Sequence, residues 1–180
     1  MHISTTGDVY DASFLEGTSR INRFDVKIKV FKSYEKIKAV DYYNHNFNCS
    51  QGVFTAFATE MGMDEKLALR IATNFGGGER KGELCGAVAG ALMVLGLRCG
   101  HCESEDGESK SKAYAVSTEF MNRFIEKNGS VVCRELLGYD LTKKEDIVAI
   151  EEQNLFRTFC PKMLESAVQI LDEMISEGLC

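Results

Sequence analysis

The sequence is poor in proline and in long apolar stretches, and each shortage excludes a class of protein. Its 180 residues include a single proline, Pro161. No apolar run approaches the roughly 18 residues that a membrane-spanning helix needs. Lysine and arginine number 21 against 27 acidic residues, a net charge of −6, which argues against a nucleic-acid binder that relies on a basic surface. The three histidines show no H-E-x-x-H motif and no pair at helical spacing, so a zinc site built on histidine is not indicated.

The first residues also lack the pattern of a secretion signal, in which a basic segment precedes an apolar one. We therefore expect a cytoplasmic protein without membrane association, whose thiols are reduced at rest. In that setting cysteines are interpreted as metal ligands, catalytic groups or core residues before structural disulfides. The length predicts one domain, because about 150 residues commonly form one.

Helical periodicity dominates residues 31–180 and predicts an all-α fold, a compact single-domain helical bundle. Asn48 is an expected helix N-cap. The glycine-rich stretch 74–82 precedes a helix expected from Glu83 to Leu97, which is apolar nearly all round and should lie buried at the centre of the domain. Pro161 is expected at the start of the last helix, where proline is tolerated.

Residues 1–30 are expected to form an N-terminal extension that is partly irregular. The stretch up to about residue 22 is polar and has no sustained period. Residues 24–30 alternate apolar and polar side chains, which is the pattern of a half-buried strand. This strand has no partner elsewhere in the sequence, so it could pair across the axis of a homodimer or lead directly into the next helix.

Seven cysteines are the chain's unusual chemical feature, and four of them share a position. A helix N-terminus offers unpaired N–H groups and about half a positive charge, which lowers the pKa of a thiol there and favours thiolate. Any one cysteine at such a place is more simply explained as a small buried hydrophobe. Four together indicate a function, provided that the helix ends converge. The four cysteines that are expected at helix N-termini are Cys49, Cys85, Cys133 and Cys160.

Glycines accompany Cys85 on both sides. Gly82, Gly86 and Gly90 recur every four residues, which on a helix makes a face without side chains. Such a face serves tight helix packing, or it leaves room for a cofactor or a partner thiol beside Cys85. The candidate cofactor-binding glycines, from the loop and the helix together, are Gly77, Gly78, Gly86 and Gly90.

The remaining three cysteines are expected to play lesser parts. Cys99 and Cys102 form a C-x-x-C pair, but the preceding helix ends there, so its dipole works against a thiolate. An auxiliary dithiol or an adventitious metal site stays open for this pair. Cys180 is expected to be idle.

The order of these motifs resembles the redox-active protein family named after its C_GCAxxG_C_C cysteine signature. Leu84 departs from the pattern, because the family has glycine before the second cysteine. The resemblance implies redox chemistry carried by the four cysteines named above and identifies no substrate. The matching pieces, within about residues 35–175, are Asn48-Cys49-Ser50-Gln51, Phe75-Gly76-Gly77-Gly78, Cys85-Gly86-Ala87-Val88-Ala89-Gly90, Cys133-Arg134-Glu135-Leu136-Leu137-Gly138 and Cys160-Pro161.

The family is also similar to part of the split-Soret cytochromes, which carry haem and an iron–sulfur site. Covalent haem does not transfer, because this chain has no C-x-x-C-H. Four thiolates match the ligand demand of an iron–sulfur cluster, so the leading hypothesis is a cluster-bearing oxidoreductase or electron-transfer protein that serves an unidentified redox partner protein. Two alternatives stay open: reversible disulfides between the same cysteines, and a non-catalytic helical protein with structural zinc or buried cysteines.

Overall fold

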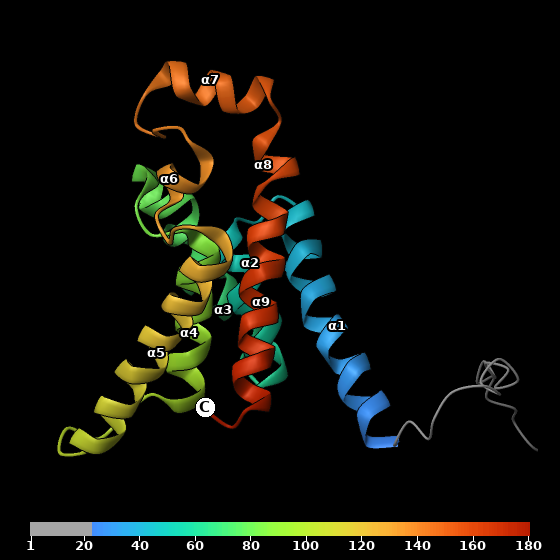
Figure 1. Cartoon of the computed structure of the whole chain (residues 1–180), viewed down its shortest axis with the longest axis vertical. Helices are drawn as coiled ribbons and strands as arrows, with labels where there is room; N and C mark the ends of the chain where they lie inside the picture. Colours follow the sequence, from blue (N-terminus) through green and yellow to red (C-terminus); the bar gives the residue numbers. More distant parts are fainter. Residues whose placement is uncertain (1–22) are drawn as a thin grey trace, which may run out of the picture.

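Helices make up most of the chain that the computed structural model describes, which is the backbone of residues 23–180 and the side chains from residue 34 onward (Figure 1). The expected all-α fold is confirmed: the described residues form no strand, only an isolated bridge between Leu84 and Val132. Two turns, η2 (Thr73–Phe75) and η3 (Gly78–Gly82), join the third helix to the fourth. The helices are α1 (Arg23–Asn44), α2 (Cys49–Glu60), α3 (Glu65–Ala72), α4 (Gly86–Cys99), α5 (Gly107–Asn128), α6 (Cys133–Leu137), α7 (Lys144–Glu152), α8 (Leu155–Thr158) and α9 (Cys160–Ser176).

The first helix shows that the prediction of a strand at residues 24–30 is wrong. These residues belong to α1. A lone strand leaves its backbone N–H and C=O groups without partners, whereas a helix pairs them within the segment. An alternation over seven residues is too short to outweigh that difference, so the homodimer pairing suggested for this strand loses its basis. The rest of the expected extension, residues 1–22, lies outside the described residues.

The most enclosed helix is α2, not α4 as expected. Residues 50–58 are all buried, between α1, α3, α4 and α9. Glycines at two positions allow this close packing. A Cβ at Gly52 would lie 2.6 Å from the carbonyl oxygen of Ala39, and a Cβ at Gly90 would lie 2.8 Å from the carbonyl oxygen of Ser50. The helix α4 is buried over its first half, and its far end is exposed.

The start of α2 is fixed by the residue expected to cap it. Asn48 Oδ1 accepts the backbone N–H of Gln51 at 3.0 Å, and the Gln51 side chain accepts the backbone N–H of Asn48 at 3.0 Å. This reciprocal pair is a capping box, which satisfies two otherwise unpaired N–H groups. The Ser50 hydroxyl bonds both Asn48 Oδ1 (2.6 Å) and the carbonyl oxygen of Ala72 (2.7 Å), so α2 and α3 hold this end of the helix together.

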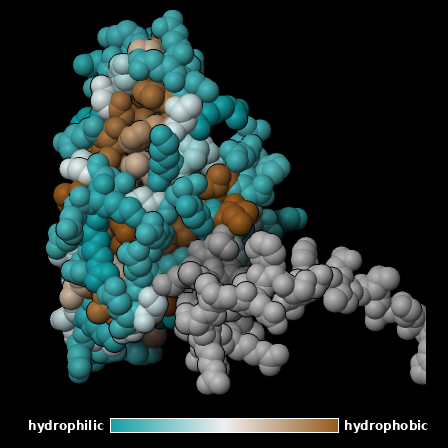
Figure 2. Space-filling view, turned by 45° about the vertical axis from the view of Figure 1, so that its right-hand side comes forward, coloured by the Kyte–Doolittle hydropathy of each residue, from teal (hydrophilic) through white to brown (hydrophobic). Residues whose placement is uncertain are grey.

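The remaining helices frame one end of the bundle. In Figure 1, α8 runs almost directly into α9, α7 crosses above them, and α6 lies on the other side of the same end. A second, smaller hydrophobic cluster is centred there on Cys133, Leu137, Leu141 and Ile150. Figure 2 shows hydrophobic residues near this end of the molecule, framed by hydrophilic ones. None of the described helices is both long and apolar enough to cross a membrane.

Candidate redox site

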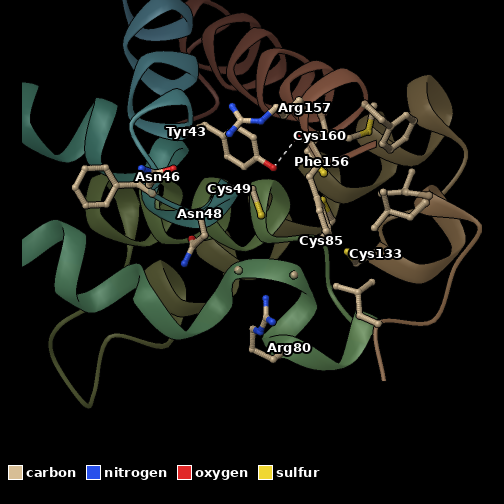
Figure 3. Close-up of a pocket in the computed structure, with 18 residues that line it drawn as sticks. Tyr43, Asn46, Asn48, Cys49, Arg80, Cys85, Cys133, Phe156, Arg157 and Cys160 are labelled. Atoms are coloured by element: carbon tan, nitrogen blue, oxygen red, sulfur yellow. Dashed lines mark hydrogen bonds between the residues drawn. The ribbon is translucent and has the colours of Figure 1, made fainter. Parts of the chain in front are cut away.

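Four cysteines from four separate elements line a single cavity (Figure 3). The cavity has a volume of about 320 Å³. Two of the side chains, Cys85 and Cys133, are buried with exposed fractions of 6% and 7%, and the other two are half-buried. The helix starts therefore converge, which is the condition that a shared site requires. We call this set the cavity cysteines: Cys49, Cys85, Cys133 and Cys160.

The helical positions of two cavity cysteines differ slightly from expectation. Cys85 is the N-cap of α4, because that helix begins at Gly86 and not at Glu83. Cys160 is the first residue of α9, and Phe159 precedes it with nearly helical angles (φ −105°, ψ −50°). The end of α8 therefore feeds α9 without a sharp break. The other two cavity cysteines begin their helices, α2 and α6, as expected.

Burial raises the pKa of every cavity cysteine, which reverses the expected effect of the helix N-termini. The pKa of Cys133 and that of Cys160 are each raised to about 12. Those of Cys49 and Cys85 are raised as well, again mainly by burial. Backbone N–H groups do act in the expected direction, and those of Gly77 and Gly86 lower the pKa of Cys49, but burial outweighs them.

Cys49 is the electrostatic centre of the set. Its negative charge, when it is ionised, raises the pKa of each of the other three cavity cysteines. Its sulfur packs directly against Gly86, where an added Cβ would collide with it. Two features therefore fix the position of Cys49. The capping box of Asn48 precedes it in the chain, and Gly86, which has no side chain, faces its sulfur.

The four candidate glycines divide into two pairs. Gly77 lines the cavity, and Gly86 supports the Cys49 sulfur. Gly78 and Gly90 do not line the cavity: a Cβ at Gly78 would collide with the backbone of Glu83, and Gly90 lies at the contact between α2 and α4. Both are thus explained by close backbone packing. The expected face of three glycines is also shorter, because Gly82 belongs to the turn η3 and not to the helix.

A left-handed turn brings Arg80 to the cavity. Four successive residues, 77–80, have positive φ angles of 64°, 58°, 50° and 64°. The first two are glycines, but Glu79 and Arg80 carry side chains and pay about 1–2 kcal/mol each for this conformation. Backbone hydrogen bonds hold the turn, from the Glu83 N–H to the Gly78 carbonyl (3.1 Å) and from the Cys133 N–H to the Glu83 carbonyl (2.6 Å).

Sequence reasoning missed the charged and aromatic residues of the cavity. Arg80 and Arg157 both line it, while no aspartate or glutamate does so among the described residues. The charged side chains that line the cavity are thus both positive, although the whole chain is acidic. Both arginines lie close to the motifs in sequence, one in the glycine-rich loop and one three residues before Cys160, and this proximity is the signal that could have found them.

Tyr43 is the other residue that sequence reasoning did not assign to the site. Its hydroxyl donates a hydrogen bond to the carbonyl oxygen of Phe156 at 2.8 Å (Figure 3). The same hydroxyl lowers the pKa of the Cys160 thiol, against the larger effect of burial. His45, two residues further on, is 70% exposed and lies outside the cavity.

The remaining three cysteines lie elsewhere, and one expectation about them is wrong. Cys180 is not idle, because it forms a disulfide with Cys99 across a Cα–Cα distance of 5.7 Å. The expectation that all thiols are reduced does not hold for this pair. Cys102 is free and exposed. The reason is tertiary: the turn after α9 returns the end of the chain to the end of α4.

Cysteine is the side chain at the cavity that most readily binds a metal. Within the described part of the chain, no three histidine, cysteine, aspartate or glutamate side chains are placed to hold a single metal ion. The four cavity cysteines line one shared volume.

The family comparison covers the same four cysteines. The model of the family described as "Putative redox-active protein (C_GCAxxG_C_C)" matches residues 47–174, which include all four cavity cysteines. The chain belongs to this family. Membership in the C_GCAxxG_C_C family indicates a redox role, and Cys180 lies beyond the matched range. Searches of the curated proteins and of the solved structures find no match.

Proposed function

We propose that the protein carries electrons through an iron–sulfur cluster held by the cavity cysteines. The observation that supports this most is their convergence, from four elements, on one cavity of about 320 Å³. Iron–sulfur clusters take four cysteine thiolates as ligands, which is the number and type of side chain available here. The cluster, when bound, supplies one-electron chemistry, and the chain's part is to hold the ligands and tune the potential.

The electrostatics of the cavity favour a positively charged ligand for the sulfurs. Burial and the charge of neighbouring thiolates raise the pKa of the thiols, so four thiolates alone would repel one another in a poorly solvated space. Metal ligation needs the deprotonated sulfur, and bound iron would replace the protons and cancel the repulsion. The N–H groups of Gly77 and Gly86, which face Cys49, would stabilise the negative charge that is left.

The rest of the cavity wall fits the same purpose. A site with four thiolate ligands is negative overall, and Arg80 and Arg157 bring positive charge to its walls. Phe156, Phe159 and Leu137 line it with apolar surface, which limits the access of water. Charge and solvent access are two of the properties by which a protein sets the reduction potential of such a site.

A dithiol–disulfide protein is the second candidate, and the central position of Cys49 supports it. One pair of cavity cysteines would lose two electrons and two protons as their disulfide forms, and the electrons would reduce a disulfide of the partner to two thiols. The attacking species is thiolate, however, and the raised thiol pKa values keep the cavity cysteines protonated at neutral pH. Exchange would therefore be slow, which ranks this candidate second.

The proposal includes a cytoplasmic setting and a redox partner protein. Both rest on the sequence and on the redox role of the family. A homodimer stays a prediction.

Anaerobic purification of the full chain, with iron and acid-labile sulfide analysis and a visible spectrum, tests the cluster. We expect iron and sulfide in equal amounts, with absorption that is bleached by a reductant. Cys49→Ser and Cys133→Ser should each lose most of the iron, because each removes one of four ligands. Cys102→Ser is the matched control, since this cysteine is exposed and outside the cavity, and its iron content should equal that of the wild type.

A colourless protein that stays free of iron after anaerobic purification and reconstitution would overturn the cluster. Peptide mapping of free thiols then separates the other candidates. A gain of two or four thiols among the cavity cysteines on mild reduction supports the disulfide function. Equimolar zinc without a measurable redox couple supports the structural role.

A further inference from the structure

A second group of cysteines lies at the opposite end of α4 from the cavity. Cys99 is the last residue of that helix and is bonded to Cys180, and Cys102 follows three residues later as a free, exposed thiol. The 14 residues of α4 span about 20 Å at about 1.5 Å per residue, so these sulfurs cannot exchange directly with the cavity cysteines at its start. This group is outside the set that the family signature describes, and Cys180 is outside the matched residues.

The end of the chain is positioned by a specific turn. After α9, Gly178 has a positive φ of 74°, its N–H bonds the carbonyl of Ile175, and the Leu179 N–H bonds that of Met174, both at 3.1 Å. This is a Schellman motif, which reverses the chain direction at a helix C-terminus. It returns the last residue to the core, where Cys180 packs against the main hydrophobic cluster. In Figure 1 the C-terminus lies beside the end of α4.

A second contact holds the same residue. Arg98 donates a hydrogen bond from Nε to the backbone carbonyl of Cys180 at 3.2 Å. This hydrogen bond ties the residue that carries the sulfur to the last turn of α4. The C-terminal end of the α4 dipole acts on Cys99 and disfavours thiolate at that sulfur.

The three sulfurs thus have different properties that suit an exchange. Cys99 and Cys180 are half-buried against the core, whereas Cys102 is exposed to solvent. The sulfur that is least suited to be a thiolate, Cys99, is the one that can remain in a disulfide throughout. The C-x-x-C spacing, with Gly100 next to the helix end, keeps the exposed thiol tethered close to it.

We propose that Cys99, Cys102 and Cys180 form a second thiol–disulfide exchange site, which accepts electrons from dithiols. The Cys102 thiolate attacks Cys99 Sγ; the Cys99–Cys102 bond forms as the Cys99–Cys180 bond breaks, and Cys180 leaves as a thiolate that takes up the proton released by Cys102. This step involves no net oxidation. An external dithiol then attacks the exposed Cys102 sulfur, passes two electrons and two protons to the Cys99–Cys102 pair, and becomes a disulfide. The site acts independently of the proposed cluster.

A brief pulse of N-ethylmaleimide on the oxidised full-length protein, without reductant, tests the internal step. Peptide mapping should find some molecules labelled on Cys102 and others on Cys180. The first kind holds the Cys99–Cys180 disulfide and the second the Cys99–Cys102 disulfide, and the two forms coexist. In Cys102→Ser the label should be absent from Cys180, since nothing can release it. Wild-type protein labelled on Cys102 alone at pH 7 and at pH 8.5 overturns the proposal, and so does protein that forms no Cys99–Cys180 bond in a redox buffer.

The rate of reduction by dithiothreitol tests the external step. Because the Cys99–Cys180 sulfurs are half-buried, direct attack should be slow, and Cys102→Ser should lower the rate about tenfold or more. Ser104→Ala is the matched control in the same exposed loop and should keep the wild-type rate. Equal rates for Cys102→Ser and the wild type overturn the proposal. Iron content is not measured in either test, so failure here is distinct from failure of the cluster.

Discussion

At the scale of single residues, the cavity cysteines show which of two opposing effects on a thiol dominates. A helix N-terminus stabilises a nearby negative charge by about 0.3–1 kcal/mol at an exposed position. Burial can raise the pKa of an acidic group by roughly 3–5 units, and each unit corresponds to about 1.4 kcal/mol. The larger effect wins, so these thiols are protonated in the absence of a metal. The positive end of each helix can therefore stabilise a thiolate that is bound to a metal, but it does not ionise the free thiol.

Tyr43 provides a test of these pKa shifts. Its hydroxyl lowers the pKa of Cys160, so Tyr43→Phe should raise that pKa further. Alkylation proceeds through the thiolate, so the rate at Cys160 should rise about tenfold per pH unit from pH 8 to 10 in metal-free, reduced protein, without a plateau. In the variant, alkylation of Cys160 should be several-fold slower at each pH, as measured by mass spectrometry after iodoacetamide pulses.

Cys133 is the internal reference for this experiment. Its pKa is also raised to about 12, and Tyr43 is not among the groups that shift it, so its rate should be the same in both proteins. A plateau below pH 9, or an equal loss of rate at both cysteines, would contradict the assignment.

At the scale of elements, the cavity depends on how closely α4 approaches its neighbours. The N-cap of α2 and the missing side chain at Gly86 together set the position of the Cys49 sulfur. A Cβ at Gly86 would also lie 2.9 Å from the carbonyl oxygen of Phe75. The turn that precedes α4 has no freedom to move away, because the Cys85 N–H is bonded to the Val131 carbonyl at 2.7 Å.

Two glycine substitutions in the same helix should therefore have opposite effects. Gly86→Ala should lower the free energy of unfolding by about 1–3 kcal/mol, as overpacked sites do, and should reduce iron content by displacing Cys49. Gly96→Ala meets nothing within 4 Å and should raise the free energy of unfolding by about 0.5–1 kcal/mol, since alanine favours a helix. Urea denaturation measures both. The same sign for the two variants would show that the contact at Gly86 is not specific.

At the scale of the whole molecule, the Cys99–Cys180 disulfide joins the end of α4 to the end of the chain. Its sequence separation is 81 residues, and the closed loop contains α5 to α9. A cross-link of this kind restricts the unfolded chain more than the folded one. The bond therefore ties the chain that follows α9, the helix of Cys160, to the end of α4.

Removing this cross-link should lower stability in oxidising conditions only. We expect Cys180→Ser to reduce the free energy of unfolding by about 2–4 kcal/mol relative to the oxidised wild type. Urea denaturation with and without a reductant measures the difference. The reductant should lower the free energy of unfolding of the wild type to that of the variant, and it should leave the value of the variant unchanged. A variant as stable as the oxidised wild type would show that the bond does not contribute.

The sequence by itself determined most of the helices and singled out four cysteines as candidates for one site. Helical periodicity and the Asn48 cap are local properties, so they identified α2 and its first cysteine, and Pro161 marked the start of α9. Local patterns failed at residues 24–30, because a strand is stable only if another strand is available to pair with it.

Only the tertiary structure decided the properties that depend on distance between segments far apart in sequence. It brought the cavity cysteines together, and it raised their pKa values by a burial that no local pattern expresses. It also added Arg80 and Arg157 to the cavity and joined Cys180 to Cys99. A helix N-terminus can be recognised from its own residues, but solvent exclusion and contact across the fold depend on the packing of the whole chain.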